Sequence, residues 1–167
     1  MKSPALVAAA PLRVWRLDDA VHAASCCSGI GAQRLGGRWN PKGVAAVYCS
    51  LDPATAILEV AVHKGFAALD AKPHVLSAIE IADPADVFAV AAASLPNANW
   101  LVPGLPSAGQ QEFGRRLLEK HEFFAIPSTV SRHSWNIVFN PAAAAGKFKL
   151  VLQEPFGLDT RLNPPRG

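Results

Sequence analysis

Residues 29–63 read GIGAQRLGGRWNPKGVAAVYCSLDPATAILEVAVH, and the rest of the chain is expected to fold around this stretch. Residues 44–49 form a continuous apolar run, which is typical of a buried strand in the centre of a sheet. Asp52 can cap free helical amides and Pro53 suits the first helical position, so a helix is predicted directly after the strand. The helix is expected to end at Gly65.

The predicted helix has one apolar face, formed by Ile57, Leu58, Ala61 and Val62. At helical spacing, Glu59 lies well round from that face. Two interpretations of Glu59 stay open. It is either a solvated residue in a weak local pair with His63, or a carboxylate that faces the preceding loop and stabilises positive charge developing on a sugar ring.

The preceding loop, residues 28–43, contains five glycines and Pro41, so irregular structure is predicted over much of its length. The GGRWN motif places Arg38 directly after a Gly-Gly pair, and a guanidinium beside glycines can bind phosphate oxygens. A surface arginine beside a turn is the plainer interpretation. Neither a GxGxxG fingerprint between strand and helix nor a GxxxxGK[ST] loop is present in the sequence.

Upstream, residues 12–17 (LRVWRL) alternate apolar and basic side chains, which predicts a half-buried strand with Arg16 near one end. Asp18 and Asp19 offer N-cap chemistry for a short helix that reaches residue 27.

Downstream, the patterns predict further strands, one amphipathic helix over residues 109–121 and a proline-rich connector over residues 95–107. The strands are expected at residues 74–81, 86–90, 123–126, 135–139 and 147–153. Six or so short strands with two clear helices predict an α+β fold, a single domain in which a small mixed sheet has flanking helices.

Composition narrows the class of protein. The chain has 167 residues, 50% of them hydrophobic, which suits one globular domain. The net charge of +3 comes without a basic stripe, so charge alone does not predict nucleic-acid binding. Three cysteines without CxxC spacing and five scattered histidines predict neither a disulfide framework nor a metal site, and a reducing cytoplasm fits best. No apolar run approaches the ~20 residues of a membrane span.

The ends of the chain are expected to lie outside the domain. Residues 1–11 are interpreted as a loose leader rather than a signal peptide, because Pro11 interrupts a short Ala-rich run. The domain is expected over residues 12–162, with a tail at residues 163–167.

Two other residues attract attention. Tyr48, the only tyrosine, lies near the end of the predicted central strand, where it either stacks on a planar ligand or fills core. Ser128 follows a proline at a predicted strand end, which exposes a hydroxyl, although an ordinary turn serine looks the same. No GxSxG elbow surrounds Ser128, so acyl transfer is not predicted.

Taken together, these segments resemble the RES domain, the toxin half of bacterial toxin–antitoxin pairs. The GGRWN core, followed at this distance by Tyr48 and by LEVxxH, is the most specific part of the resemblance. The other matching segments are VWRL, SGIGAQRLGGRWNPKG, VYCS, ILEVAVH, LP with the following tryptophan at 95–100, IPSTV, WNIVFNP and FGLDTRL.

The resemblance implies a fold like that of ADP-ribosyltransferases and an activity on NAD, with no metal. Described RES proteins deplete NAD by cleaving the nicotinamide–ribose bond and transferring the ADP-ribose to water or to phosphate. Other members of the family modify a protein target. The expected function is therefore that of an NAD-degrading toxin, and an ADP-ribosyltransferase acting on a specific protein is the alternative. A non-catalytic module that keeps only the fold stays open as a third class.

By motif position, the resemblance implies a role for each of six residues. Arg16 and Arg38 are expected to clamp the pyrophosphate, and Tyr48 to stack against the nicotinamide side. Glu59 is expected to bind the ribose hydroxyls and to offset the oxocarbenium-like charge as nicotinamide leaves. The matching serine is Ser128, expected to orient that carboxylate or the ring amide, and Asn136 matches a recurring family asparagine.

The resemblance also implies a protein partner. An antitoxin with an Xre-type DNA-binding domain is expected to occlude the pocket, so that this chain reaches DNA only through that partner. A homodimer of this chain within the complex is compatible with the same resemblance, and no membrane association is expected.

Overall fold

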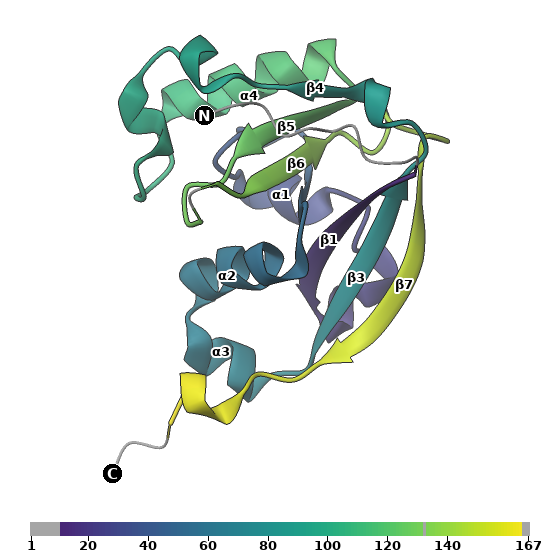
Figure 1. The fold of residues 1–167 in the computed structure, drawn as a ribbon, viewed down its shortest axis with the longest axis vertical. Coiled ribbons are helices and arrows are strands. Elements are labelled where there is room, and N and C mark those ends of the chain that lie inside the picture. Colours follow the sequence, from purple (N-terminus) through teal and green to yellow (C-terminus); the bar gives the residue numbers. More distant parts are fainter. Residues whose placement is uncertain (1–10, 132, 165–167) are drawn as a thin grey trace.

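In a computed structural model, which describes residues 11–131 and 133–164, the chain forms a seven-stranded sheet with helices on its outer face (Figure 1). The strand order is β4-β5-β6-β2-β1-β3-β7, and all neighbours are antiparallel except the parallel pair β4 and β5. The strands are β1 Leu12–Asp19, β2 Val47–Ser50, β3 His74–Ile81, β4 Val87–Ala89, β5 Phe123–Pro127, β6 Trp135–Phe139 and β7 Phe148–Phe156. The prediction of a single α+β domain is confirmed.

Strand β2 lies in the middle of the sheet, as predicted, and it divides the sheet into two halves. It pairs with β6 along its whole length, from Val47 to Ser50. With β1 it shares only the pair Trp15 and Ser50. The two halves are therefore joined by a single residue pair between β2 and β1.

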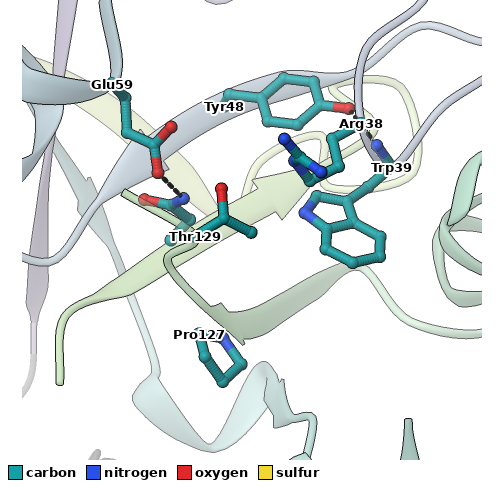
Figure 2. Close-up of a pocket in the computed structure, with 7 residues that line it drawn as sticks. Arg38, Trp39, Tyr48, Glu59, Pro127 and Thr129 are labelled. Atoms are coloured by element: carbon teal, nitrogen blue, oxygen red, sulfur yellow. Dashed lines mark hydrogen bonds between the residues drawn. The ribbon is translucent and has the colours of Figure 1, made fainter. Parts of the chain in front are cut away.

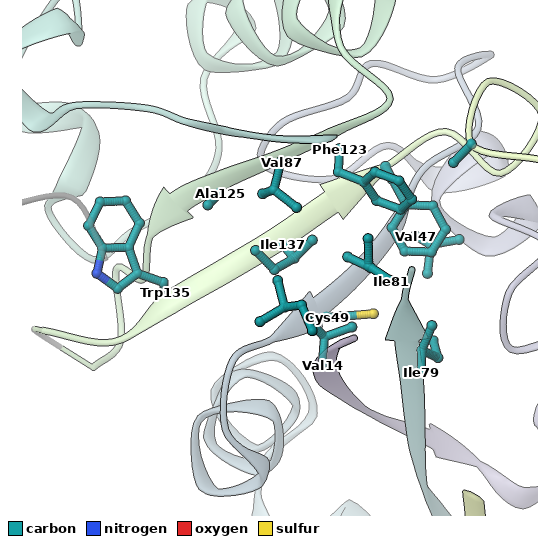
Figure 3. Packing of buried hydrophobic residues seen from close by; sticks show 13 residues of the cluster. Val14, Val47, Cys49, Ile79, Ile81, Val87, Phe123, Ala125, Trp135 and Ile137 are labelled. Carbon is teal, nitrogen blue, oxygen red and sulfur yellow. The ribbon is translucent and has the colours of Figure 1, made fainter. Parts of the chain in front are cut away.

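The inner face of the sheet curls around one apolar core to which all seven strands contribute (Figure 3). Phe123 of β5 packs against Phe139 of β6 and Phe148 of β7, with ring centroids 5.1 and 6.5 Å away. β5 is second and β7 is last in the strand order, so the two ends of the sheet meet across this core. Burial of such apolar surface is the main source of stability.

Helix α2 (Pro53–Lys64) begins and ends as predicted. Asp52 accepts a hydrogen bond from the Thr55 amide at 2.8 Å, and Gly65 at φ 83° follows the last turn. The predicted apolar face is partly wrong, because Val62 is 64% exposed. The buried side instead uses Ile57, Val60 and Ala61, which pack with Trp15 and Leu17 of β1.

Helix α4 (Ala108–Lys120) covers the other half of the outer face (Figure 1). It starts with a capping box in which Ser107 and Gln110 exchange hydrogen bonds between side chain and backbone. Leu117 and Leu118 are buried against β5 and β6, which fits the predicted amphipathic character of the helix. Helix α3 (Phe66–Ala71) follows α2 and contributes Leu69 to the same core as α2.

Some boundaries differ from the predictions. Residues 28–43 were expected to be largely irregular, yet they contain a short helix, α1 (Ile30–Leu35). Asp19 makes no side-chain cap, and the following helix is a 3-10 turn, Ala20–Ser25. The connector, as expected, has no α-helix or strand in its described part, but it contains a 3-10 turn at Ala98–Leu101, and another 3-10 turn precedes it at Ala92–Ser94. Further 3-10 turns are Pro84–Asp86 and Thr160–Leu162.

The expected leader and tail lie outside the described residues, except for Pro11, Asn163 and Pro164. Within residues 11–131 and 133–164, no helix has the length and apolar character needed to cross a membrane.

Candidate active site

A small cavity of about 40 Å³ opens on the outer face of the sheet, over β2 and β6 (Figure 2). Its walls come from the GGRWN motif, β2, α2, the end of β5 and β6. The lining residues are Arg38, Trp39, Tyr48, Glu59, Pro127, Thr129 and Asn136. Four of the six residues expected at the site line this cavity, and Ser128 contacts one of them.

Glu59 is held by two donors that reach the same carboxylate oxygen. Its Oε1 accepts a hydrogen bond from the Ser128 hydroxyl at 2.9 Å and another from the Asn136 amide nitrogen at 2.5 Å. The hydroxyl of Ser128 also accepts hydrogen bonds from the amides of Val130 and Ser131. Its own proton is therefore directed at Glu59, while Glu59 Oε2 makes no hydrogen bond among the described residues.

Ser50, which sequence reasoning missed, orients Asn136. Its hydroxyl donates to Asn136 Oδ1 at 2.8 Å, which turns the amide nitrogen of Asn136 toward Glu59. Ser50 is 2% exposed, so a specific partner is needed for its hydroxyl. The available signal was spacing, because Ser50 lies two residues after Tyr48 and shares its face in the observed strand, one residue beyond the predicted one.

Tyr48 serves the site with its ring and the fold with its hydroxyl. The hydroxyl accepts a hydrogen bond from the Trp39 amide at 3.0 Å and donates to Asn40 Oδ1 at 2.6 Å. A Cβ at Gly37 would lie 2.6 Å from the same hydroxyl, so the close approach requires a glycine there. Burial raises the pKa of Tyr48 above its ordinary range, which keeps the hydroxyl protonated.

Asn40 anchors this turn from the other side. It is fully buried, and its amide nitrogen donates to the carbonyls of Ala32, Pro41 and Val44. The GGRWN motif is therefore a rigid turn, fixed by Tyr48 and Asn40, that projects Arg38 toward the cavity.

Arg38 faces Glu59 across the cavity (Figure 2). Its guanidinium donates to the carbonyl of Gly104 in the connector at 2.6 Å, and it forms no ion pair with Glu59 among the described residues. Burial lowers the pKa of Arg38, and the negative charge of Glu59 opposes that shift. The cavity thus presents a guanidinium on one wall and a carboxylate on the other.

Arg16 is not brought to this cavity. Along β1 it shares a face with Val14 of the inner core, whereas Tyr48 points to the outer face. Its guanidinium holds Asp18 through two hydrogen bonds, of 2.7 and 2.5 Å, and donates to the backbone carbonyl of Tyr48 at 2.9 Å. Burial acts to lower the pKa of Arg16, but Asp18, together with Cys49 and Cys26, acts in the opposite direction, and the net effect is a raised pKa. The expected joint clamp of Arg16 and Arg38 is not formed, because they lie on opposite faces of the sheet.

The arrangement suits a ligand that carries an anionic group, hydroxyl groups and a planar ring. A guanidinium can bind an anionic group, and a carboxylate with one uncommitted oxygen can bind hydroxyls or stabilise a nearby positive charge. Trp39 and Tyr48 add aromatic surface for a planar ring. In the described part of the chain, no group of three or more His, Cys, Asp or Glu side chains is placed to hold a metal ion.

Comparisons with known proteins show which family the chain is similar to. The model of the family described as the RES domain matches residues 13–159. The protein called Toxin Res from Photorhabdus laumondii is 31% identical over 153 residues, which cover 89% of this chain and 96% of that protein. The Prs ADP-ribosylating toxin of a Sphingobium species is 31% identical over 134 residues, which cover 77% of this chain and 81% of that protein.

A solved structure shares the fold. A chain in the crystal structure of the M. tuberculosis MbcT–MbcA toxin–antitoxin complex superposes with a TM-score of 0.71 at 19% sequence identity. The match covers 88% of this chain and 85% of that chain, so it includes both halves of the sheet.

Proposed function

The chain belongs to the RES domain family, and from that premise we propose that it is the toxin of a toxin–antitoxin pair that acts by cleaving the nicotinamide–ribose bond of NAD. Water or phosphate then receives the ADP-ribose. The observation that carries this proposal is the position of Glu59, fixed through one oxygen by Ser128 and Asn136 and facing Arg38 across the cavity.

The roles follow from the positions of the charges. Arg38 binds the pyrophosphate, and Tyr48 packs against the nicotinamide side of the substrate. Glu59 binds the ribose with its uncommitted oxygen and offsets the positive charge that builds up on the sugar as neutral nicotinamide leaves. Ser128 and Asn136 hold the carboxylate in place, so little reorganisation accompanies the reaction.

Arg16 has a different role in this proposal from the one expected at first. Its hydrogen bond to the Tyr48 carbonyl supports β2 from the inner face, so it positions the strand that carries Tyr48. Of the two arginines expected to bind the pyrophosphate, only Arg38 keeps that role.

The cavity has to widen for the substrate. Pockets for drug-sized ligands enclose roughly 300–1,000 Å³, far more than the 40 Å³ present here. Arg38 is at present satisfied by the Gly104 carbonyl, so binding exchanges that carbonyl for a phosphate oxygen and frees the connector to move.

Substitution of Glu59 and Arg38 tests the proposal. Glu59→Ala and Arg38→Ala are expected to lower the rate of NAD loss by at least about 100-fold and to leave circular dichroism spectra unchanged, since neither side chain belongs to the core. Glu119→Ala, which removes an exposed carboxylate on α4, is the matched control. NAD loss is measured with purified, antitoxin-free protein, with and without phosphate. Full turnover by a folded Glu59→Ala protein would refute the assignment.

A second function is favoured by the Sphingobium relative, whose name describes an ADP-ribosylating toxin. In that case the same site transfers ADP-ribose to a specific protein. NAD labelled in the adenosine half, incubated with the protein and a bacterial extract, separates the two. Label in free ADP-ribose or its phosphate supports NAD degradation, and label on one protein band supports transfer. Absence of any NAD loss would favour a non-catalytic module.

The proposed partner is an Xre-type antitoxin, and the proposed place of action is the cytoplasm. The related fold was solved within a toxin–antitoxin complex, which supports a protein partner. Co-expression with the protein encoded beside it should yield a stable complex that no longer consumes NAD. DNA binding is expected only from that complex.

A further inference from the structure

We propose that Thr129 is a further substrate-binding residue, which binds the 3′-hydroxyl of the ribose attached to nicotinamide. This inference rests on the proposed function and adds a contact to the same site. Thr129 directly follows Ser128 in the segment between β5 and β6, and it lines the cavity.

The first argument is the direction of the side chain. Figure 2 shows the Thr129 hydroxyl pointing into the cavity, in the space between the carboxylate of Glu59 and the guanidinium of Arg38. Thr129 is only 8% exposed, so the cavity is the main surface that its side chain can reach.

The second argument is the state of the hydroxyl. The neighbouring hydroxyls are all engaged, since Ser128 donates to Glu59 and Ser131 pairs with Ser134 at 2.8 Å. Thr129 makes no side-chain hydrogen bond to the described part of the chain. Among the described residues, the one fully buried side-chain polar atom without a hydrogen-bond partner is His74 Nε2, so the Thr129 hydroxyl is open to the cavity, where a ligand can bind it.

The third argument is the order of groups along the cavity. NAD carries its pyrophosphate, its ribose and its nicotinamide bond in sequence, and the cavity presents Arg38, Thr129 and Glu59 in the same sequence. Glu59 serves the carbon that loses nicotinamide and the adjacent 2′-hydroxyl. The 3′-hydroxyl lies on the phosphate side of that position, where Thr129 faces it. A threonine hydroxyl can both donate and accept, which suits a sugar hydroxyl.

Thr129→Val tests the contact, because valine keeps the shape and removes only the hydroxyl. It is expected to reduce kcat/KM for NAD by about 3- to 10-fold, as for one lost neutral hydrogen bond. Thr129→Ser, which keeps the hydroxyl, should stay closer to the wild-type value. Thr160→Val, at an exposed position outside the site, is the matched control. Thermal unfolding confirms that each variant is folded.

An NAD analogue that lacks the 3′-hydroxyl on the nicotinamide ribose identifies the partner. Wild type and Thr129→Val should cleave this analogue equally, because the Thr129 hydroxyl of the wild type has no 3′-hydroxyl to bind in the analogue. A deficit of Thr129→Val that persists with the analogue would overturn the assignment, as would a Thr129→Val protein that cleaves NAD at the wild-type rate.

Binding of ADP-ribose, measured by calorimetry, separates this inference from the proposed function. A wild-type protein that binds ADP-ribose but leaves NAD intact would sink the proposed function alone. Thr129→Val is expected to bind ADP-ribose about 3- to 10-fold more weakly. An unchanged affinity would sink the Thr129 contact, whatever the turnover measurements show.

Discussion

At the scale of single residues, Tyr48 couples the site to the fold. Its ring lines the cavity, and its hydroxyl joins the Trp39 amide to Asn40. Because it is the only tyrosine, its ionisation can be followed by the near-ultraviolet absorbance of tyrosinate without interference from other tyrosines.

Tyr48 is expected to resist ionisation in the native protein. Burial raises its folded pKa above the unfolded value of about 10. A raised folded pKa contributes stability that is fully present below the unfolded pKa and is lost as pH rises toward the folded pKa. Tyrosinate should therefore appear in the native protein only above that range, together with unfolding. In guanidinium chloride it should appear near pH 10, within about one unit. A native titration at the ordinary pKa would contradict the buried hydrogen-bonded hydroxyl.

Single residues also show where the sequence stops being informative. Glu59 and Ser128 each had a plainer interpretation, as a surface carboxylate and a turn serine. Their contact joins positions 69 residues apart, so no local pattern contains it. The alternation of β1 predicts that Arg16 shares one strand face with Val14. Which of the two faces meets the cavity depends on the helices that pack on the sheet, and these come from other parts of the chain.

At the scale of elements, α4 supports the GGRWN turn from behind. Gln111 donates to the Gly37 carbonyl at 2.9 Å, and Gly114 lies against the backbone of Trp39. A Cβ at Gly114 would come 2.0 Å from the Trp39 carbonyl oxygen, so the helix can approach this closely only without a side chain.

Gly114→Ala is therefore expected to be destabilising, although alanine is the better helix former. Overpacking costs about 1–3 kcal/mol, and the shift of α4 should also lower NAD cleavage because it displaces Arg38. Gly31→Ala in α1 is the matched control, since a Cβ there meets nothing within 4 Å. Urea unfolding measures the stability of both variants. Equal midpoints for the two variants would show that α4 does not rest on Trp39.

The predicted elements are most accurate where residues close in sequence determine their bounds. Strands β3 and β6 match their predicted bounds, and α2 matches because its cap and its terminal glycine are encoded locally. Strand β2 starts later than predicted, since the Val44 carbonyl is used by Asn40 instead of the sheet. Helix α1 was missed because its flanking glycines, Gly29 and Gly36, act as its ends and were read as breakers.

At the scale of the whole molecule, the curled sheet holds the two halves together. The halves share little pairing at β2, so the inner core supplies the contact between the ends of the sheet. Phe123 is fully buried there, between Phe139 and Phe148. The sequence indicated the strands, but the curl depends on contacts between strands that are distant in order.

Phe123→Ala is expected to lower the free energy of unfolding by about 3–5 kcal/mol, a large share of the 5–15 kcal/mol that is roughly typical of a domain. Phe88→Ala, at a ring that is 43% exposed on β4, should cost much less. Denaturant unfolding measures both. A Phe123→Ala protein with wild-type stability would mean that the ends of the sheet do not depend on this core.

The wide spacing of the site along the chain also affects its synthesis. Asn136, one of the two donors that orient Glu59, is added to the growing chain 77 residues after it, and the strand that closes the inner core is later still. A nascent chain on the ribosome has Arg38 and Tyr48 exposed long before the carboxylate has its donors. The site is therefore incomplete until Asn136 and the later strand have been translated, and a partner made alongside the chain has that interval in which to bind before the proposed activity can begin.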